Sequence, residues 1–161
     1  MMELETQRLR IDPFSKNDIE HWANIEADAL VRKYIDGKPL TAEDAERYIL
    51  RNIKSYKDNG FGRYAVRLLK DNTLIGMCGF LEEPYGIDFG YRFGHDYWQK
   101  GYATEAAGAL VAYGHQALKM QHIVAWVHPE NSASMHVLKK LNFEHLGQDF
   151  LCDITVEKFQ H

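Results

Sequence analysis

One ten-residue run, residues 97–106 (YWQKGYATEA), constrains the fold of this chain more than any other feature. A strand-like segment, 87–93, comes directly before it, and an alanine-rich helical pattern, 103–118, follows it. This order places free backbone N–H groups and the positive end of a helix dipole beside the carboxyl end of a strand. Gly101 lets an anion approach the backbone closely, and Ala103 keeps the first helical turn slim. The run therefore predicts a binding site for a phosphate or pyrophosphate.

The same run differs from the two best-known phosphate-binding motifs. It lacks the Gly-Lys-Ser/Thr ending of a P-loop and the G-x-G-x-x-G pattern of a dinucleotide fold. It resembles the pyrophosphate-binding loop of the GNAT superfamily of acyl-CoA N-acyltransferases, Gln/Arg-x-x-Gly-x-Gly/Ala, although Trp98 stands where Gln or Arg is usual. The wording Trp-x-Lys-Gly-Tyr-Ala-Thr-Glu-Ala resembles one branch, the ribosomal-protein alanine acetyltransferase-like enzymes. The alternative is an ordinary glycine-bearing turn before a helix.

Size and charge restrict the class of protein. A length of 161 residues predicts one domain, residues 1–161, with a core of its own. A net charge of −4 and a pI of about 6.0 indicate no basic face for nucleic acid. The apolar runs are far shorter than a membrane span, and the acidic start differs from a signal peptide. We expect a cytoplasmic protein that binds neither nucleic acid nor a membrane. It is expected to be a monomer or a homodimer.

Neither the cysteines nor the histidines indicate a redox or metal site. Cys78 and Cys152 are far apart in strand-like runs, which predicts reduced core thiols. The eight histidines show neither H-E-x-x-H nor a Cys/His ligand spacing. We therefore expect no metal.

Periodicity and capping signals predict a mixed α/β fold of the α+β class, in the order β-α-α-β-β-β-α-β-α-β-β. The segments 87–93 and 123–127 are expected to be parallel, because a helix joins them. The predicted strands are 8–12, 63–69, 73–80, 87–93, 123–127 and a closing hairpin within 143–159; the predicted helices are a short one after the capping box at 15–18, then 41–57, 103–118 and 131–141.

This order is the GNAT order, and the resemblance spans essentially the whole chain. It implies a central mixed sheet with helices on both faces, splayed between the fourth and fifth predicted strands. It also implies acetyl-CoA as cosubstrate, with the pantetheine arm in the wedge and the pyrophosphate at the helix N-terminus. The splay is implied by the resemblance alone.

The loop is expected to bind the coenzyme mainly through backbone N–H groups of residues 99–104. Lys100 adds charge near a phosphate or simply faces solvent. The resemblance places the backbone of Phe93 alongside the pantetheine and the thioester carbonyl. The predicted coenzyme-binding residues of this region are Phe93, Trp98, Gln99, Lys100, Gly101, Tyr102, Ala103 and Thr104.

A second segment, 131–143, resembles the family pattern Asn-x-x-Ser…Lys-x-Gly-Phe, in which Lys140 is the lysine. The resemblance implies that the Asn131 amide binds the pantetheine and that the Ser134 hydroxyl faces the coenzyme near its sulfur. The alternative is that Asn131 caps the helix and Ser134 lies in its first turn. Asn142 replaces the usual glycine, and asparagine tolerates the left-handed turn expected there.

The sequence does not identify a single general acid or general base. Leu138 stands where many members of the superfamily carry a tyrosine that protonates the leaving thiolate. The thiolate is therefore protonated by Ser134 or by a water, or it leaves without an acid. Asp88 is a candidate general base on the strand before the loop, or it forms a salt bridge to Arg92 or Arg67. Asp153 is a second candidate by loose resemblance.

Three aromatic residues lie in regions that line the acceptor pocket in this fold. They are Trp22, Tyr34 and Tyr85, and the alternative is that they belong to the core. No Ser-His-Asp or Cys-His pattern is present, which agrees with direct attack by the amine.

The sequence therefore indicates an acetyl-CoA-dependent N-acetyltransferase that acts in a ternary complex. The acceptor is a primary amine, of a protein N-terminus, an amino acid, a polyamine or an antibiotic. One alternative is a non-catalytic acyl-CoA-binding module. Another is a nucleotide- or phosphosugar-binding domain that uses the same helix N-terminus.

Overall fold

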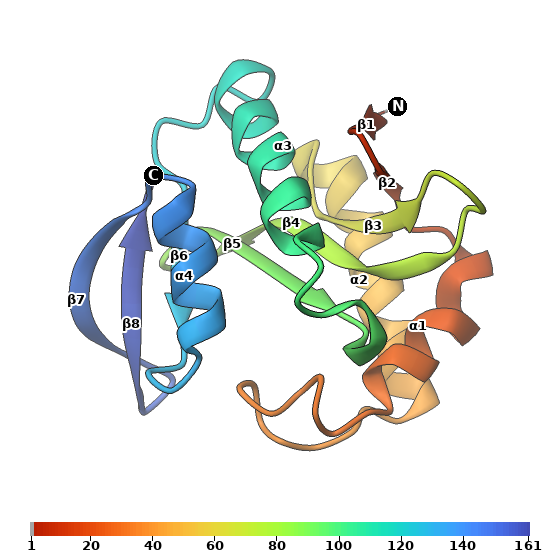
Figure 1. Cartoon of the computed structure of the whole chain (residues 1–161), viewed down its shortest axis with the longest axis horizontal. Helices are drawn as coiled ribbons and strands as arrows, with labels where there is room; N and C mark the ends of the chain where they lie inside the picture. Colours follow the sequence, from red (N-terminus) through yellow and green to blue (C-terminus); the bar gives the residue numbers. More distant parts are fainter. Residues whose placement is uncertain (1) are drawn as a thin grey trace.

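A computed structural model describes residues 2–161, and Met1 lies outside the described residues. The strands form one eight-stranded mixed sheet in the order β1-β2-β3-β4-β5-β6-β8-β7 (Figure 1). The strands are β1 (Leu4–Glu5), β2 (Leu9–Pro13), β3 (Arg63–Leu68), β4 (Leu74–Glu83), β5 (Gly86–Phe93), β6 (Val124–Val127), β7 (Glu144–Leu151) and β8 (Ile154–Gln160). The helices are α1 (Ile19–Glu26), α2 (Ala42–Asn59), α3 (Tyr102–Gln116) and α4 (Ser132–Lys140), with two 3₁₀ turns, η1 (Lys16–Asp18) and η2 (His95–Tyr97).

The predicted fold class and order of elements are confirmed, with small differences at the ends. The structure adds the two-residue strand β1, which pairs with β2 and is too short to show any periodicity. The helix expected at 103–118 begins one residue earlier and ends at Gln116. The strand expected at 8–12 is shifted by one residue, to Leu9–Pro13.

Local capping signals account for the helix boundaries. Ser15 and Asp18 form a reciprocal capping box ahead of α1, as predicted. Thr41 caps α2 through its hydroxyl, which accepts the Asp44 N–H at 3.1 Å. The helix ends at Gly60, whose φ of +80° lies in the left-handed region that favours glycine.

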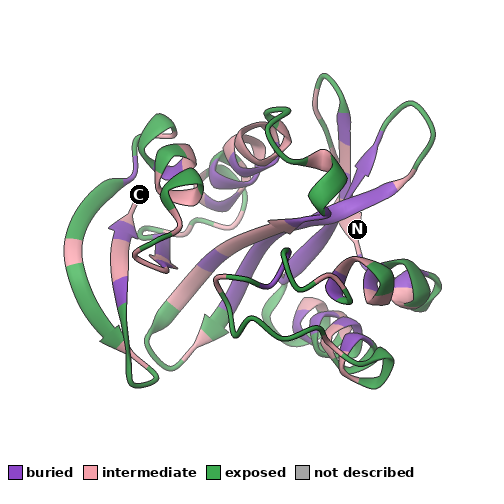
Figure 2. Cartoon of the chain, turned by 60° about the horizontal axis from the view of Figure 1, so that its bottom comes forward, coloured by how far each residue is buried: buried purple, intermediate pink, exposed green. Residues whose placement is uncertain are grey.

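Helices cover both faces of the sheet, so the molecule has two apolar clusters. α3 and α4 contribute to the larger cluster, and Leu110 and Leu138 are completely buried there. α1 and α2 form the smaller one on the opposite face, around Trp22 and Ile49. Figure 2 shows burial along β3 and β4, whereas β7 is exposed along most of its length.

The two parallel strands at the centre of the sheet are scarcely joined. β5 and β6 share a single facing pair, Asp88 and Val124, whereas β4 and β5 are paired along the whole of β5. Beyond that pair the strands separate, and β5 runs on toward the N-terminus of α3 (Figure 1). The structure thus has the splay that the resemblance implied, at the strands counted there as fourth and fifth.

The two cysteines differ in a way that the sequence did not show. Cys78 is completely buried in β4, where burial raises the pKa of its thiol. Cys152 is exposed in the turn between β7 and β8, at a φ of +49°. The prediction of a core thiol is therefore wrong for Cys152, because a turn interrupts the strand-like run. No helix among residues 2–161 combines the length and the apolar composition that a membrane span requires.

Candidate active site

Two residues with left-handed backbone shape the turn between β5 and α3. Gln99 and Gly101 have φ values of +59° and +81°, and this left-handed geometry reverses the chain just before the helix. The first helical hydrogen bond is donated by Glu105 N–H to the Gly101 carbonyl, at 3.1 Å. Within residues 2–161, the N–H groups of residues 99–104 have no acceptor. The sequence places a cluster of free donors here at the positive end of α3.

The structure explains why a tryptophan can begin this turn. The indole N–H of Trp98 donates to the carbonyl of Phe93, at 2.8 Å, and so closes the turn onto the last residue of β5. His95 packs edge-on against the same indole, with ring centroids 4.7 Å apart. Trp98 therefore sets the shape of the turn through its side chain.

A cation that the sequence analysis missed lies beside this turn. Arg8, which precedes β2, donates from Nη1 to the Lys100 carbonyl at 2.8 Å, and its guanidinium lies 4.4 Å from the centre of the Tyr102 ring. Its Nε pairs with Glu105 at 2.7 Å. Arg8 and Glu105 are 97 positions apart, so no local pattern links them.

Glu105 is held at the start of α3 by several donors. It accepts from the Thr6 hydroxyl at 2.6 Å and from the Arg8 N–H at 2.8 Å, in addition to the Arg8 side chain. Partial burial raises the pKa of Glu105, but these hydrogen bonds outweigh it and hold the pKa below its ordinary value. Glu105 thus anchors the N-terminal part of the chain to the first turn of α3.

The second predicted segment forms α4 and its cap. Asn131 Oδ1 accepts the Ser134 N–H at 3.2 Å, so Asn131 does cap the helix, while its amide nitrogen has no partner within residues 2–161. Lys140 is exposed at the end of α4, and Leu138 is completely buried in the core. Leu138, which the resemblance aligns with a proton-donating tyrosine, therefore has no proton to give.

Ser134 has a partner on the opposite side of the wedge. The hydroxyl of Tyr91, on β5, lies 2.8 Å from Ser134 Oγ and donates to the Ser134 carbonyl at 3.0 Å. Burial raises the pKa of Tyr91, so its phenol is protonated at neutral pH. No sequence signal separates Tyr91 from the core aromatic residues of the same strand.

Asp88 forms a salt bridge, but not with the predicted arginines. Its Oδ2 accepts from Nη2 of the buried Arg63 at 2.7 Å, so the expectation of Arg92 or Arg67 as partner is wrong. Arg63, Gly79 and Gly90 lie in register across β3, β4 and β5. A side chain at Gly90 would meet the Arg63 guanidinium at 3.0 Å, so the glycine leaves the room through which Arg63 reaches Asp88.

The environment of Asp88 opposes its charge. Burial raises the pKa of its carboxyl above the ordinary value, although Arg63 acts in the opposite direction. Asp88 lies where β5 and β6 are still joined, on the face toward α1 and α2, whereas Tyr91 faces α4. The two candidate proton-transfer groups, Asp88 and Ser134, therefore lie on opposite faces of β5.

The other two arginines belong to separate buried networks. Arg92 pairs with Glu26, which also accepts from Arg32 at 2.5 Å and has no exposed surface. Arg67 pairs with Asp12 and Asp18, each at 2.8 Å. Both networks lie between the sheet and the segment that contains α1.

The predicted acceptor-side aromatic residues are distributed along this face. Trp22 is completely buried against Phe14 and Tyr48. Tyr34 packs on His128, with ring centroids 5.3 Å apart, and so joins the α1–α2 loop to the end of β6. Tyr85, at the β4–β5 turn, packs edge-on against Trp126 of β6 at 4.5 Å. Asp153 lies in the exposed β7–β8 turn, at a φ of +63°.

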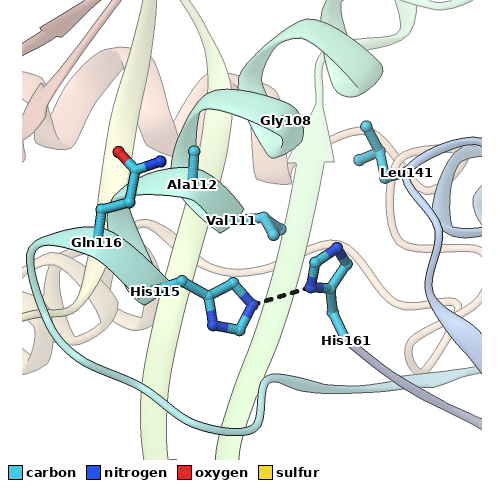
Figure 3. A pocket seen from close by; sticks show the side chains of 7 residues that line it. All are labelled: Gly108, Val111, Ala112, His115, Gln116, Leu141 and His161. Atoms are coloured by element: carbon cyan, nitrogen blue, oxygen red, sulfur yellow. Dashed lines mark hydrogen bonds between the residues drawn. The ribbon is translucent and has the colours of Figure 1, made fainter.

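A shallow pocket lies elsewhere on the molecule and contains none of the predicted site residues. Its volume is about 320 Å³, and Figure 3 shows His115 and His161 facing each other in it, with Nε2 and Nδ1 2.8 Å apart. The Met120 carbonyl can only accept, so His115 Nδ1–H donates to it, and in the neutral ring His115 Nε2 then accepts from His161 Nδ1–H. The described residues contain no group of three or more His, Cys, Asp or Glu side chains placed to hold a metal.

Comparisons with known proteins agree with this architecture. The sequence model described as "Acetyltransferase (GNAT) domain" matches residues 8–144. An uncharacterized N-acetyltransferase of Bacillus subtilis is 32% identical over 148 residues, which cover 91% of this chain and 85% of the relative. A GNAT-family acetyltransferase structure from Bacillus anthracis has a TM-score of 0.86 at 28% identity, over 99% of this chain and 98% of that one. The structure of a ribosomal L7/L12 alpha-N-protein acetyltransferase with coenzyme A shares the fold, with a TM-score of 0.82 at 16% identity over 99% and 97%.

Proposed function

The chain belongs to the GNAT acetyltransferase family, and we propose that it transfers an acetyl group from acetyl-CoA to a primary amine. The observation that carries the proposal is the row of N–H groups at residues 99–104 that find no acceptor among residues 2–161, next to the separation of β5 from β6. Backbone donors at a helix N-terminus suit a pyrophosphate, and a gap between two strands suits an extended arm. The wording of the loop supports the ribosomal-protein alanine acetyltransferase-like branch.

The residues present fit this donor molecule. The loop from Trp98 to Thr104 would hold the pyrophosphate through its backbone, with Arg8 and Lys100 adding positive charge nearby. The backbone of Phe93 and the amide nitrogen of Asn131, which has no partner among residues 2–161, would bind the pantetheine. Lys140, at the end of the same segment, is also proposed to contact the coenzyme. Gly101 has no side chain to obstruct the anion, and its φ of +81° is one that favours glycine.

The reaction then needs no covalent intermediate on the protein. The neutral amine attacks the thioester carbonyl, the new C–N bond forms as the C–S bond breaks, and the electron pair of that bond goes to sulfur. The amine loses one proton, and the coenzyme thiolate gains one. Asp88 is our proposed base because its pKa is raised, and the proton would travel through a water, since Arg63 occupies one carboxylate oxygen. Asp153 is the weaker candidate, because its turn is exposed.

The acceptor would enter from the face that carries α1 and α2. Tyr34 and Tyr85 are the proposed contacts there, since both have exposed surface, whereas the buried Trp22 would act by supporting the wall of the site. The proposed acceptors are a protein N-terminus, an amino acid, a polyamine or an antibiotic amine. A protein N-terminus is the first to test, because a structural neighbour is described as an alpha-N-protein acetyltransferase.

The test combines binding with turnover. The purified chain is titrated with acetyl-CoA by calorimetry, after a check for co-purified coenzyme, and thiol release is then followed with a panel of amines. Micromolar binding together with amine-dependent thiol release would support the proposal. Binding without release for any amine would favour a non-catalytic acyl-CoA-binding module, for which the buried Leu138 is the supporting observation. No binding by a folded chain would contradict both.

A further inference from the structure

The hydroxyl groups of Tyr91 and Ser134 form a pair across the wedge. Tyr91 lies on β5 and Ser134 lies on α4, which follows β6 in the chain (Figure 1). The two positions are 43 residues apart, and the oxygens are 2.8 Å from each other. Their contact therefore links the two sides of the gap that the proposed function assigns to the pantetheine arm.

The number of protons limits how this pair can be arranged. Each hydroxyl carries one hydrogen, and Tyr91 has two acceptors within reach, Ser134 Oγ at 2.8 Å and the Ser134 carbonyl at 3.0 Å. If Tyr91 donates to the carbonyl, Ser134 Oγ can give its own hydrogen to Tyr91. If Tyr91 donates to Ser134 Oγ, the hydrogen of Ser134 is free to face another acceptor. The pair thus has one resting arrangement and one in which Ser134 is an available donor.

The Tyr91 phenol also competes with a hydrogen bond that the Ser134 hydroxyl could form to a carbonyl earlier in its own chain segment. A serine in a helix readily turns its hydroxyl back to a carbonyl three or four residues earlier. Leu138, one turn further along α4, is buried and has no polar side-chain atom that could bind the Ser134 hydroxyl in place of Tyr91. Tyr91 is therefore the side chain that holds the Ser134 hydroxyl toward the wedge.

We propose that Tyr91 is a positioning residue that directs the Ser134 O–H toward the sulfur of the leaving coenzyme. This inference rests on the proposed function. As the C–S bond breaks, its electron pair moves to sulfur, and the developing thiolate accepts a hydrogen bond from Ser134, while Tyr91 donates to Ser134 Oγ. The thiolate then takes up a proton from solvent, and this balances the one released by the amine.

The variant Tyr91→Phe tests this role with little change in volume. We expect kcat for acetyl transfer to fall about 5–10-fold, the value of one hydrogen bond, with the KM for acetyl-CoA within about two-fold of wild type. Ser134→Ala should fall at least as far, and the double variant no further than Ser134→Ala alone. Tyr113→Phe, which removes a hydroxyl from a half-buried tyrosine of α3, is the control and should behave as wild type.

A change of leaving group separates this role from simple packing. With phenyl thioacetate as donor, whose thiolate is a much weaker base, the deficit of Tyr91→Phe should shrink toward the wild-type rate. An equal deficit with both donors, additive losses in the double variant, or unchanged kcat would each overturn the inference. Absence of acetyl-CoA binding or turnover in the wild-type chain would overturn the proposed function itself, and the role of Tyr91 with it. Should Tyr91→Phe melt early, kcat is measured below its melting temperature with both donors, because a packing defect would lower the two rates equally.

Discussion

The two faces of β5 are built in different ways. Toward α3 and α4, the polar groups at the wedge are backbone N–H groups and the hydroxyls of Tyr91 and Ser134. Toward α1 and α2, they are buried ion pairs, such as that of Arg63 with Asp88. Backbone donors in one turn depend on a short run of sequence, whereas an ion-pair network depends on residues far apart in the chain. Changes to the turn on the first face should therefore alter coenzyme binding, and breaking a buried ion pair on the second face should alter stability.

The largest effect is expected from the ion-pair face. Glu26→Ala removes the carboxylate that Arg32 and Arg92 share and leaves their charges buried without it. Breaking a buried pair in this way costs about 3–5 kcal/mol, so urea denaturation should show a fall of that size in the free energy of unfolding. Asp58→Ala, which removes the exposed partner of Lys54, is the matched control and should cost less than about 1 kcal/mol. Equal losses in the two variants would contradict the contrast between the faces.

The next effect tests the backbone site directly. Gly101→Glu puts a side chain where φ is +81° and a negative charge beside the proposed pyrophosphate. Like-charge repulsion of about 1–4 kcal/mol, together with the side chain in the path of the anion, predicts roughly 100-fold weaker binding of acetyl-CoA. Gly147→Glu is the control, because Gly147 on β7 also has a left-handed φ, +95°, and an added side chain there would meet nothing within 4 Å. Its affinity for acetyl-CoA, measured by calorimetry, should be unchanged. Unchanged affinity in Gly101→Glu would refute the assignment of the loop.

A smaller effect is expected at the cation beside the loop. Arg8→Gln removes the hydrogen bond to the Lys100 carbonyl and the positive charge near the turn. We expect acetyl-CoA to bind about 5–10-fold more weakly, with no change for S-acetylpantetheine, which lacks the pyrophosphate. Arg10→Gln changes a nearby arginine, in β2, that pairs with Asp12 instead, and it should leave both affinities unchanged. A loss of affinity for both donors in Arg8→Gln would mean that Arg8 acts on the fold and not on the phosphate.

The smallest effect concerns pH. The folded-state pKa of Glu105 lies below its ordinary value, so the carboxylate stabilises the fold above the unfolded-state pKa of 4.5. This contribution is lost as the pH falls through the lower, folded-state pKa. The difference in free energy of unfolding between wild type and Glu105→Gln should therefore be about 1 kcal/mol at neutral pH and should disappear in acid. Glu43→Gln, which removes an exposed first-turn carboxylate of α2, is the control variant and is measured in the same way.

Much of the fold could be predicted because its signals are local. The capping box at Ser15 and the left-handed end of α2 at Gly60 each depend on a few adjacent residues. The exposed position of Cys152 could not be predicted, because the run from Phe150 to Ile154 is apolar enough to resemble a continuous strand. A two-residue strand such as β1 gives no periodicity at all, and it exists because β2 offers it an edge to pair with.

The candidate site divides along the same line. The sequence by itself determined the order of elements, the donor-rich turn at Gly101 and the cap at Asn131, since dihedral preferences, helix dipoles and periodicity act over a few residues. Only the tertiary structure decided that Arg63 pairs with Asp88, because the register of three strands and a missing side chain at Gly90 open the route between them. The splay of β5 from β6 likewise decided that Tyr91 meets Ser134, a contact between side chains that no spacing along the chain encodes.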